Sequence, residues 1–189
     1  MKRKSIAILA ISAALLSLAT GCTPKSKITY KPGKVVSCSS IPRFVPDNVM
    51  IPANQVLRCL DGSASEETLH FKGPVVVNVW GSWCGPCEQE MKYFRALAAT
   101  EKVKIVGIDV EEANMKMPRQ FIVRQGMTWP SLFDPDGRTR TIFGMGVPVT
   151  WFIDATGSVV HKQIGVMTSA RQLSDLLAQY LGITVSLKA

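Results

Sequence analysis

Cys84 and Cys87 are separated by two residues, and of all the residues in this sequence they have the spacing best suited to redox chemistry. Such a pair can form and break a disulfide reversibly when the first sulfur is a reachable thiolate and the second resolves the mixed disulfide. A static disulfide and half of a zinc site are the alternatives. A zinc site needs further ligands at suitable spacing, and the sequence has neither a second C-x-x-C nor a pair of closely spaced histidines. The spacing therefore favours thiol–disulfide exchange.

The segments on either side of the pair predict how the two sulfurs are presented. Residues 75–80 form a run rich in valine, which is typical of a buried central strand. Residues 85–99 carry apolar side chains at helical spacing, so Cys84 would lie at a helix N-terminus, where free N–H groups and the helix dipole stabilise a thiolate. Pro86 suits the first turn because it has no N–H to leave unpaired. We predict that Cys84 is the nucleophile and that Cys87 is the resolving thiol.

The rest of the chain alternates strand and helix patterns, which predicts an α/β fold. Further strands are expected at 103–110, 131–133, 149–153 and 158–164, and helices at 113–125, 138–143 and 169–181. The last two strands would form a hairpin about a turn at 154–157. Residues 35–73 are rich in turn-forming residues and predict short extended pieces and loops in place of a helix.

Three stretches carry a resemblance to a known family: residues 75–87 (VVVNVWGSWCGPC), 133–137 (FDPDG) and 146–154 (GVPVTWFID). They resemble the thioredoxin superfamily and, more narrowly, its membrane-anchored ResA/TlpA group of extracytoplasmic thiol–disulfide oxidoreductases. The resemblance covers roughly residues 55–181. It implies an α/β thioredoxin-like fold, in which a central mixed β-sheet is flanked by helices, with an N-terminal extension. It also implies a strand–helix insertion that contains the helix at 113–125.

The same resemblance implies a substrate-binding side to the site. Pro148 would be the family's cis-proline, facing the active-site disulfide, and its sharp turn would leave the backbone of Val147 free to pair with an extended substrate segment. Independently of the resemblance, we expect Trp83 to pack around the site, with a further role as an apolar platform for substrates left open.

A proton-transfer residue is the next implication of the resemblance. Asn78 occupies the position where cytoplasmic thioredoxins carry a buried acid, and an amide cannot take up a proton there. In the ResA/TlpA group a glutamate three residues after the second cysteine has been proposed for this role, which points to Glu90. The alternative is that Glu90 is a solvated acid in the first turn of the helix, and the sequence leaves both readings open.

The N-terminus has the pattern of an export signal. Residues 2–4 are basic and precede an apolar stretch that is too short for a comfortable membrane span. The stretch ends in LATGC, which resembles a lipoprotein cleavage box with Cys22 as the acylated residue. We expect residues 1–21 to be a signal peptide, 22–34 a tether, and 35–189 the thioredoxin-like domain with its extension. Ordinary cleavage nearby and an uncleaved anchor are the alternatives, and each version places the domain outside the cytoplasm.

Cysteine parity agrees with this assignment, since lipid on Cys22 leaves four of the five cysteines. We expect Cys38 and Cys59 to form a structural disulfide beneath the N-terminal extension. Neither lies in a C-x-x-C motif or at an expected helix N-terminus, so neither is placed for activation. A redox relay that passes electrons to Cys84 and a pair of buried free thiols are the alternatives.

Charge and chemistry together set the expected function. The formal net charge is +8, but no run of Lys or Arg occurs beyond the leader, so nucleic acid is not an expected partner. We expect dithiol–disulfide exchange with cysteines of other exported proteins, anchored at a membrane through Cys22. The Gly-Pro spacer matches thioredoxin, whose potential lies near about −270 mV, and this favours a reductase.

The resemblance implies apocytochrome c as one possible substrate and a membrane electron donor of the thiol–disulfide type. No cofactor beyond the redox-active disulfide and no metal is expected. The alternatives are an oxidase or isomerase that assists disulfide formation in exported proteins, and a non-catalytic metallochaperone on a thioredoxin scaffold.

Overall fold

The structure is a computed structural model of the chain, and it describes residues 32–44, 55–144 and 146–188. The expected signal peptide, Cys22 and all but the last three residues of the expected tether lie outside the described residues. Across the described ranges, no helix has both the length and the apolar character needed to span a bilayer.

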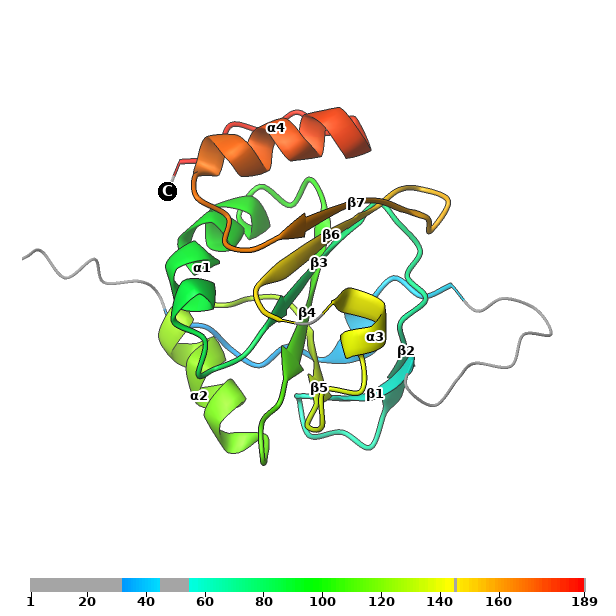
Figure 1. The fold of residues 1–189 in the computed structure, drawn as a ribbon, viewed down its shortest axis with the longest axis vertical. Helices are drawn as coiled ribbons and strands as arrows, with labels where there is room; N and C mark the ends of the chain where they lie inside the picture. Colours follow the sequence, from blue (N-terminus) through cyan, green and yellow to red (C-terminus); the bar gives the residue numbers. More distant parts are fainter. Residues whose placement is uncertain (1–31, 45–54, 145, 189) are drawn as a thin grey trace, which may run out of the picture.

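A mixed sheet of seven strands, in the order β2-β1-β5-β4-β3-β6-β7, forms the centre of the described chain (Figure 1). The strands β3, β4 and β5 are mutually parallel, and the remaining neighbours pair antiparallel. The predicted α/β fold with a central mixed sheet is therefore confirmed. Its strands are β1 (Val56–Cys59), β2 (Glu66–Thr68), β3 (Val75–Trp80), β4 (Lys104–Val110), β5 (Ser131–Asp134), β6 (Val149–Ile153) and β7 (Val159–Ile164).

The sheet is covered on both faces, which is why every residue of β3 is buried. One face packs against three helices, α1 (Gly85–Ala98), α2 (Lys116–Gln125) and α4 (Ala170–Leu181). The other face packs against the short helix α3 (Arg140–Phe143) and the 3₁₀ turn η1 (Cys38–Ser40).

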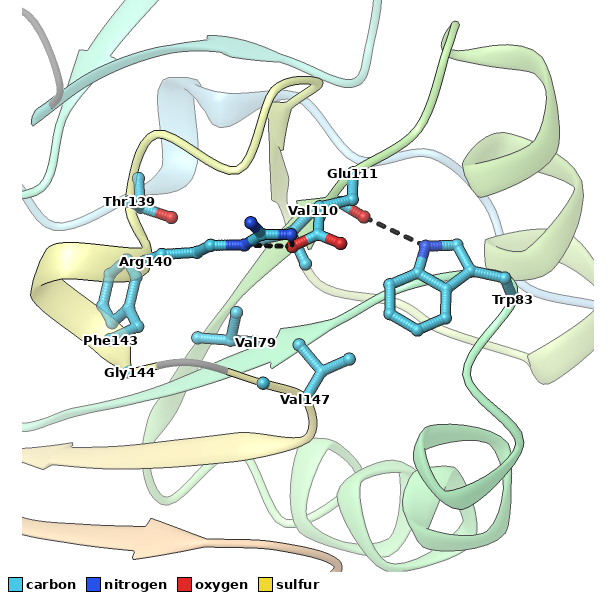
Figure 2. Close-up of a pocket in the computed structure, with 10 residues that line it drawn as sticks. Val79, Trp83, Val110, Glu111, Thr139, Arg140, Phe143, Gly144 and Val147 are labelled. Atoms are coloured by element: carbon cyan, nitrogen blue, oxygen red, sulfur yellow. Dashed lines mark hydrogen bonds and ion pairs between the residues drawn. The ribbon is translucent and has the colours of Figure 1, made fainter.

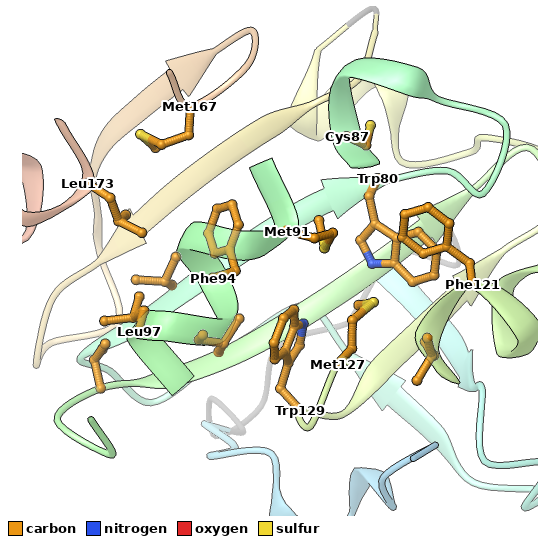
Figure 3. Packing of buried hydrophobic residues seen from close by; sticks show 14 of the residues in the cluster. Trp80, Cys87, Met91, Phe94, Leu97, Phe121, Met127, Trp129, Met167 and Leu173 are labelled. Atoms are coloured by element: carbon orange, nitrogen blue, oxygen red, sulfur yellow. The ribbon is translucent and has the colours of Figure 1, made fainter. Parts of the chain in front are cut away.

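The larger of the two cores lies beneath α1 (Figure 3). Trp80 stacks on Phe121 of α2 with ring centroids 4.9 Å apart, and Phe94 of α1 is fully buried in the same cluster. Burying a side chain of this size contributes about 1.5–3 kcal/mol. The active-site helix is thus fixed to the strand that precedes it by an aromatic core.

Local sequence signals set the helix ends. Gly126 closes α2 with a left-handed φ of 66°, as the pattern predicts, and the helix starts at Lys116, a few residues after the expected position. The Ser169 side chain accepts a hydrogen bond from the Gln172 N–H at 3.0 Å and so caps α4.

The segment expected to contain only extended pieces and loops also contains one helical turn. Ser37 caps η1 by accepting a hydrogen bond from the Ser39 N–H at 3.3 Å, so the three residues from Cys38 to Ser40 form a 3₁₀ turn. Ser and Asn residues in such stretches favour local caps of this kind. Among the other described residues of this segment, β1 and β2 pair as a short antiparallel hairpin, in agreement with the expectation.

The folded domain begins earlier than the expected boundary at residue 35. The Gly33 N–H donates to the Val123 carbonyl at 3.0 Å, and the Lys34 N–H donates to the Met127 carbonyl at 3.1 Å. A Cβ atom on Gly33 would lie 2.3 Å from the Ile122 carbonyl oxygen, so no larger residue fits there. The last two residues of the expected tether are therefore part of the domain.

A second disulfide joins the N-terminal extension to the sheet. Cys38 in η1 is bonded to Cys59 in β1, and both residues are fully buried. The carbonyl oxygen of Ser131 in β5 lies 3.7 Å and 3.9 Å from the two sulfurs. Burial removes both sulfurs from solvent thiols, which favours a structural role over a relay; that role stays a prediction.

We predict that replacing both Cys38 and Cys59 with alanine lowers the free energy of unfolding by roughly 3 kcal/mol, because the disulfide closes a loop with a sequence separation of 21. Urea unfolding of the two proteins measures the loss. Titration of the wild type with a mild reductant should open Cys84–Cys87 well before Cys38–Cys59. Simultaneous opening of both disulfides would contradict the structural role.

Candidate active site

The first turn of α1 is built around the sulfur of Cys84. Cys84 is the N-cap residue, with extended backbone angles, and its Sγ accepts a hydrogen bond from the Cys87 N–H at 3.1 Å. Pro86 lies within the first turn, as predicted. The Cys84 N–H donates to the Gly81 carbonyl at 3.1 Å, which closes the turn between β3 and α1.

The two sulfurs of the pair differ in access. They form a disulfide, in which Cys84 keeps 5% of its surface exposed and Cys87 is fully buried. An incoming thiol can therefore approach Cys84, while Cys87 is reached through Cys84. In the reduced protein the free N–H groups at the start of α1 would stabilise a thiolate on Cys84. This arrangement can carry out thiol–disulfide exchange.

Pro148 follows a cis peptide bond from Val147, as the resemblance implied. The antiparallel pairing of Val149 with Val79 places this bond next to the carboxyl end of β3, from which the active-site turn leaves. Sequence comparison with the family was sufficient to find this residue, because the motif GVP carries it.

A groove of about 290 Å³ lies beside the active-site turn. Figure 2 shows Trp83 and Arg140 on opposite sides of the groove, with Val79 and Val147 between them. Trp83 is 55% exposed, and its Nε1 donates to the Val110 carbonyl at 3.3 Å. Arg140 forms an ion pair with Glu111 at the rim. The groove thus brings Trp83 and Val147 together, with an apolar floor and a polar edge.

Glu90 is not a solvated acid of the first turn, and that alternative is wrong. Its side chain is fully buried, where it accepts hydrogen bonds from the Asn78 amide at 2.9 Å and from the Met167 N–H at 2.8 Å. Burial raises the pKa of Glu90 to about 7, although both hydrogen bonds act in the opposite direction. Glu90 therefore holds or releases a proton in the range where thiols exchange, one helical turn beyond Cys87.

Two further acids near the site were missed by the sequence reasoning. Glu112 accepts a hydrogen bond from the Ser82 N–H at 2.7 Å, in the turn that leads to Cys84. Asp109 is fully buried in β4. For Asp109 the sequence carried a signal, which is an acid inside the otherwise apolar run IVGIDV. A charged residue in a central strand is costly to bury, so such an acid points to a functional position.

The two histidines of the chain do not line the groove beside the active-site turn. His161 stacks on Tyr180 of α4 with ring centroids 4.1 Å apart, and His70 lines a separate pocket beside Phe71. The part of the chain that the structure describes holds no group of three or more His, Cys, Asp or Glu residues placed to bind a metal ion.

The fold and this site together define the class of the protein, which is a thiol–disulfide oxidoreductase. The chain belongs to the redoxin family, whose model matches residues 39–180. The chain is 34% identical over 120 residues to the thiol-disulfide oxidoreductase ResA of Bacillus thuringiensis, covering 61% of this chain and 68% of that protein. It is 31% identical over 114 residues to the thiol:disulfide interchange protein DsbE of Allochromatium vinosum, covering 57% of this chain and 61% of that protein.

A solved structure agrees on the fold. This chain superposes on the crystal structure of a putative thiol:disulfide interchange protein DsbE from Chlorobium tepidum. The TM-score is 0.53 and the sequence identity is 23%. The match covers 80% of this chain and 96% of that one. The thioredoxin-like fold expected from the resemblance is confirmed.

Burial of Glu90 predicts a measurable pH dependence of stability. The folded protein holds the Glu90 proton up to a pH of about 7, whereas an unfolded glutamate releases it near its ordinary value of 4.5. The free energy of unfolding should therefore fall between these two pH values in the wild type. In Glu90→Gln this fall should be smaller by roughly 2–3 kcal/mol. Urea unfolding of both oxidised proteins from pH 4 to 8 measures the difference, and identical slopes would show that Glu90 does not titrate as its burial requires.

Proposed function

We propose that this protein reduces disulfides in other exported proteins through Cys84 and Cys87. The observation that carries the proposal is the asymmetry of the pair. At the N-terminus of α1, Cys84 keeps 5% of its surface exposed, whereas Cys87 has none exposed. The Gly-Pro spacer supports the reducing direction, because thioredoxin has the same spacer and a reduction potential of about −270 mV.

The exchange would proceed in two balanced steps. The Cys84 thiolate attacks one sulfur of the substrate disulfide, a mixed disulfide forms, and the departing sulfur takes the electron pair and then a proton. Cys87 then loses its proton and attacks the sulfur of Cys84, which releases the second substrate thiolate and leaves the Cys84–Cys87 disulfide. Two electrons pass to the substrate. Glu90 would accept the Cys87 proton. It is buried one helical turn beyond Cys87, and its pKa of about 7 suits proton uptake near neutral pH.

The groove beside Cys84 would hold the substrate. Trp83 offers an exposed apolar surface, and the backbone of Val147 stands before the cis bond to Pro148, where an extended segment could pair with it. Relatives named as thiol-disulfide oxidoreductase and thiol:disulfide interchange protein support protein thiols as partners. Apocytochrome c is the particular substrate that we propose, with a membrane dithiol as the electron donor.

We predict that Cys84→Ser abolishes reduction of insulin disulfides and that Cys87→Ser accumulates a mixed disulfide through Cys84. The reason is that the first variant lacks the attacking sulfur and the second lacks the resolving one. Turbidity of reduced insulin and mass spectrometry of trapped complexes provide the measurements. Activity that persisted in Cys84→Ser would place the site elsewhere.

The potential of the Cys84–Cys87 couple decides the direction of exchange. Equilibration with glutathione or dithiothreitol should give a value near about −270 mV, as in thioredoxin. A value near about −120 mV, as in a strong oxidant, would favour the oxidase or isomerase alternative. Stoichiometric copper binding without exchange would instead favour a metallochaperone.

We further propose that the domain is held at the outer face of a membrane by lipid on Cys22. The support is the basic leader and the LATGC sequence, since two or more acyl chains give stable anchoring. Metabolic labelling with a fatty-acid analogue should mark the wild type and leave Cys22→Ala unlabelled. Equal labelling of both proteins, or of neither, would contradict an anchor at this residue.

A further inference from the structure

Asp109 is a buried acid that the exchange chemistry described above does not use. Its side chain is fully buried, and neither carboxyl oxygen has a hydrogen-bond partner among the described residues. The sheet register pairs Asp109 with Trp80 of β3 and with Phe133 of β5. Paired residues of parallel strands project to the same face, and Trp80 and Phe133 belong to the core that contains Cys87. Asp109 therefore lies on the side of the sheet that carries the active site.

The end of β4 also supports the turn that presents the nucleophile. Glu112 accepts a hydrogen bond from the Ser82 N–H at 2.7 Å, and the Val110 carbonyl accepts one from Trp83 Nε1 at 3.3 Å. Ser82 and Trp83 directly precede Cys84 in the sequence. The position of Cys84 is therefore coupled to the segment that begins at Asp109.

The groups around Asp109 disfavour its charged form. Glu112 follows it along the chain, and Asp134 comes next in β5 after Phe133, the register partner of Asp109. The Arg138 guanidinium lies 4.0 Å from the Asp134 carboxylate. Neighbouring β3 contributes the uncharged Trp80, which belongs to the same buried cluster as Cys87 of α1 (Figure 3). Burial first, and then the two acids, raise the pKa of Asp109 to about 9. A fully buried carboxyl with no hydrogen-bond partner among the described residues is costly to ionise, so the uncharged form of Asp109 is favoured.

We propose that Asp109 is a positioning residue for thiol–disulfide exchange, whose buried and unpartnered carboxyl governs how firmly Glu112 holds the turn before Cys84. An ionised Asp109 would repel the Glu112 carboxylate and weaken its bond to the Ser82 N–H. The inference rests on exchange at Cys84–Cys87, and it does not depend on the reducing direction proposed above.

The test compares the full chain with Asp109→Asn, which keeps the shape of the neutral carboxyl and cannot ionise. The rate at which dithiothreitol reduces Cys84–Cys87 is measured from pH 7 to pH 10 in both proteins. Dividing the wild-type rate by the variant rate at each pH cancels the effect of the ionisation of dithiothreitol itself. The two rates should agree within about twofold at pH 7. At pH 10 the wild type should be slower by roughly fivefold, a coupling ordinary for residues that share a network. Asp136→Asn, at an exposed acid, should follow the wild type throughout.

A second measurement serves if Asp109→Asn does not fold. Carboxyl ¹³C NMR of the oxidised wild type should show Asp109 protonated at pH 7, and Glu112→Gln should move its midpoint to lower pH because a neighbouring charge is removed. A rate ratio that is constant with pH, an ionised Asp109 at pH 7, or a midpoint unmoved in Glu112→Gln would overturn the inference. Absence of exchange in the wild type at every pH would instead refute the proposed function.

Discussion

The sulfur of Cys84 closes the N-terminus of α1, and the site depends on this cap. Because Sγ accepts the Cys87 N–H at 3.1 Å, the two cysteines are held on one turn with their sulfurs at bonding distance. The same free N–H groups that fix the turn would stabilise negative charge on the first sulfur when the disulfide is open. Capping and activation are therefore one interaction. The aromatic core around Trp80 holds the helix against β3 so that this geometry persists.

Buried acids beneath the site oppose the stability of the fold. Glu90 and Asp109 are both fully buried, and burial raises the pKa of each above its ordinary value. Such groups cost free energy at neutral pH that apolar residues would not cost. The surrounding hydrophobic core offsets that cost. The cost is understandable if Glu90 takes up the Cys87 proton and Asp109 positions the turn before Cys84, as we propose.

The sequence was sufficient to predict the parts of the site that rest on local motifs. Cys84 and Cys87 follow from their spacing after a strand, and Pro148 follows from the GVP motif of the resembling family. The burial of Glu90 was not predictable, because its partners come from a neighbouring strand and from the loop before α4, 77 residues away in the chain. Asp109 was overlooked for a different reason. Its role depends on which face of the sheet it shares, and that is fixed by strand order, which single-sequence patterns leave open.

The ionisation of the two active-site thiols in the reduced protein tests the account most directly. Alkylation by iodoacetamide across pH, with each site read by mass spectrometry, gives the thiolate fraction of each cysteine. The account predicts that Cys84 reacts with a midpoint well below the ordinary thiol value of about 8.5, while Cys87 stays unmodified in the folded protein. Equal reactivity of the two thiols, or a Cys84 midpoint at or above the ordinary value, would contradict a helix cap that both positions and activates the nucleophile.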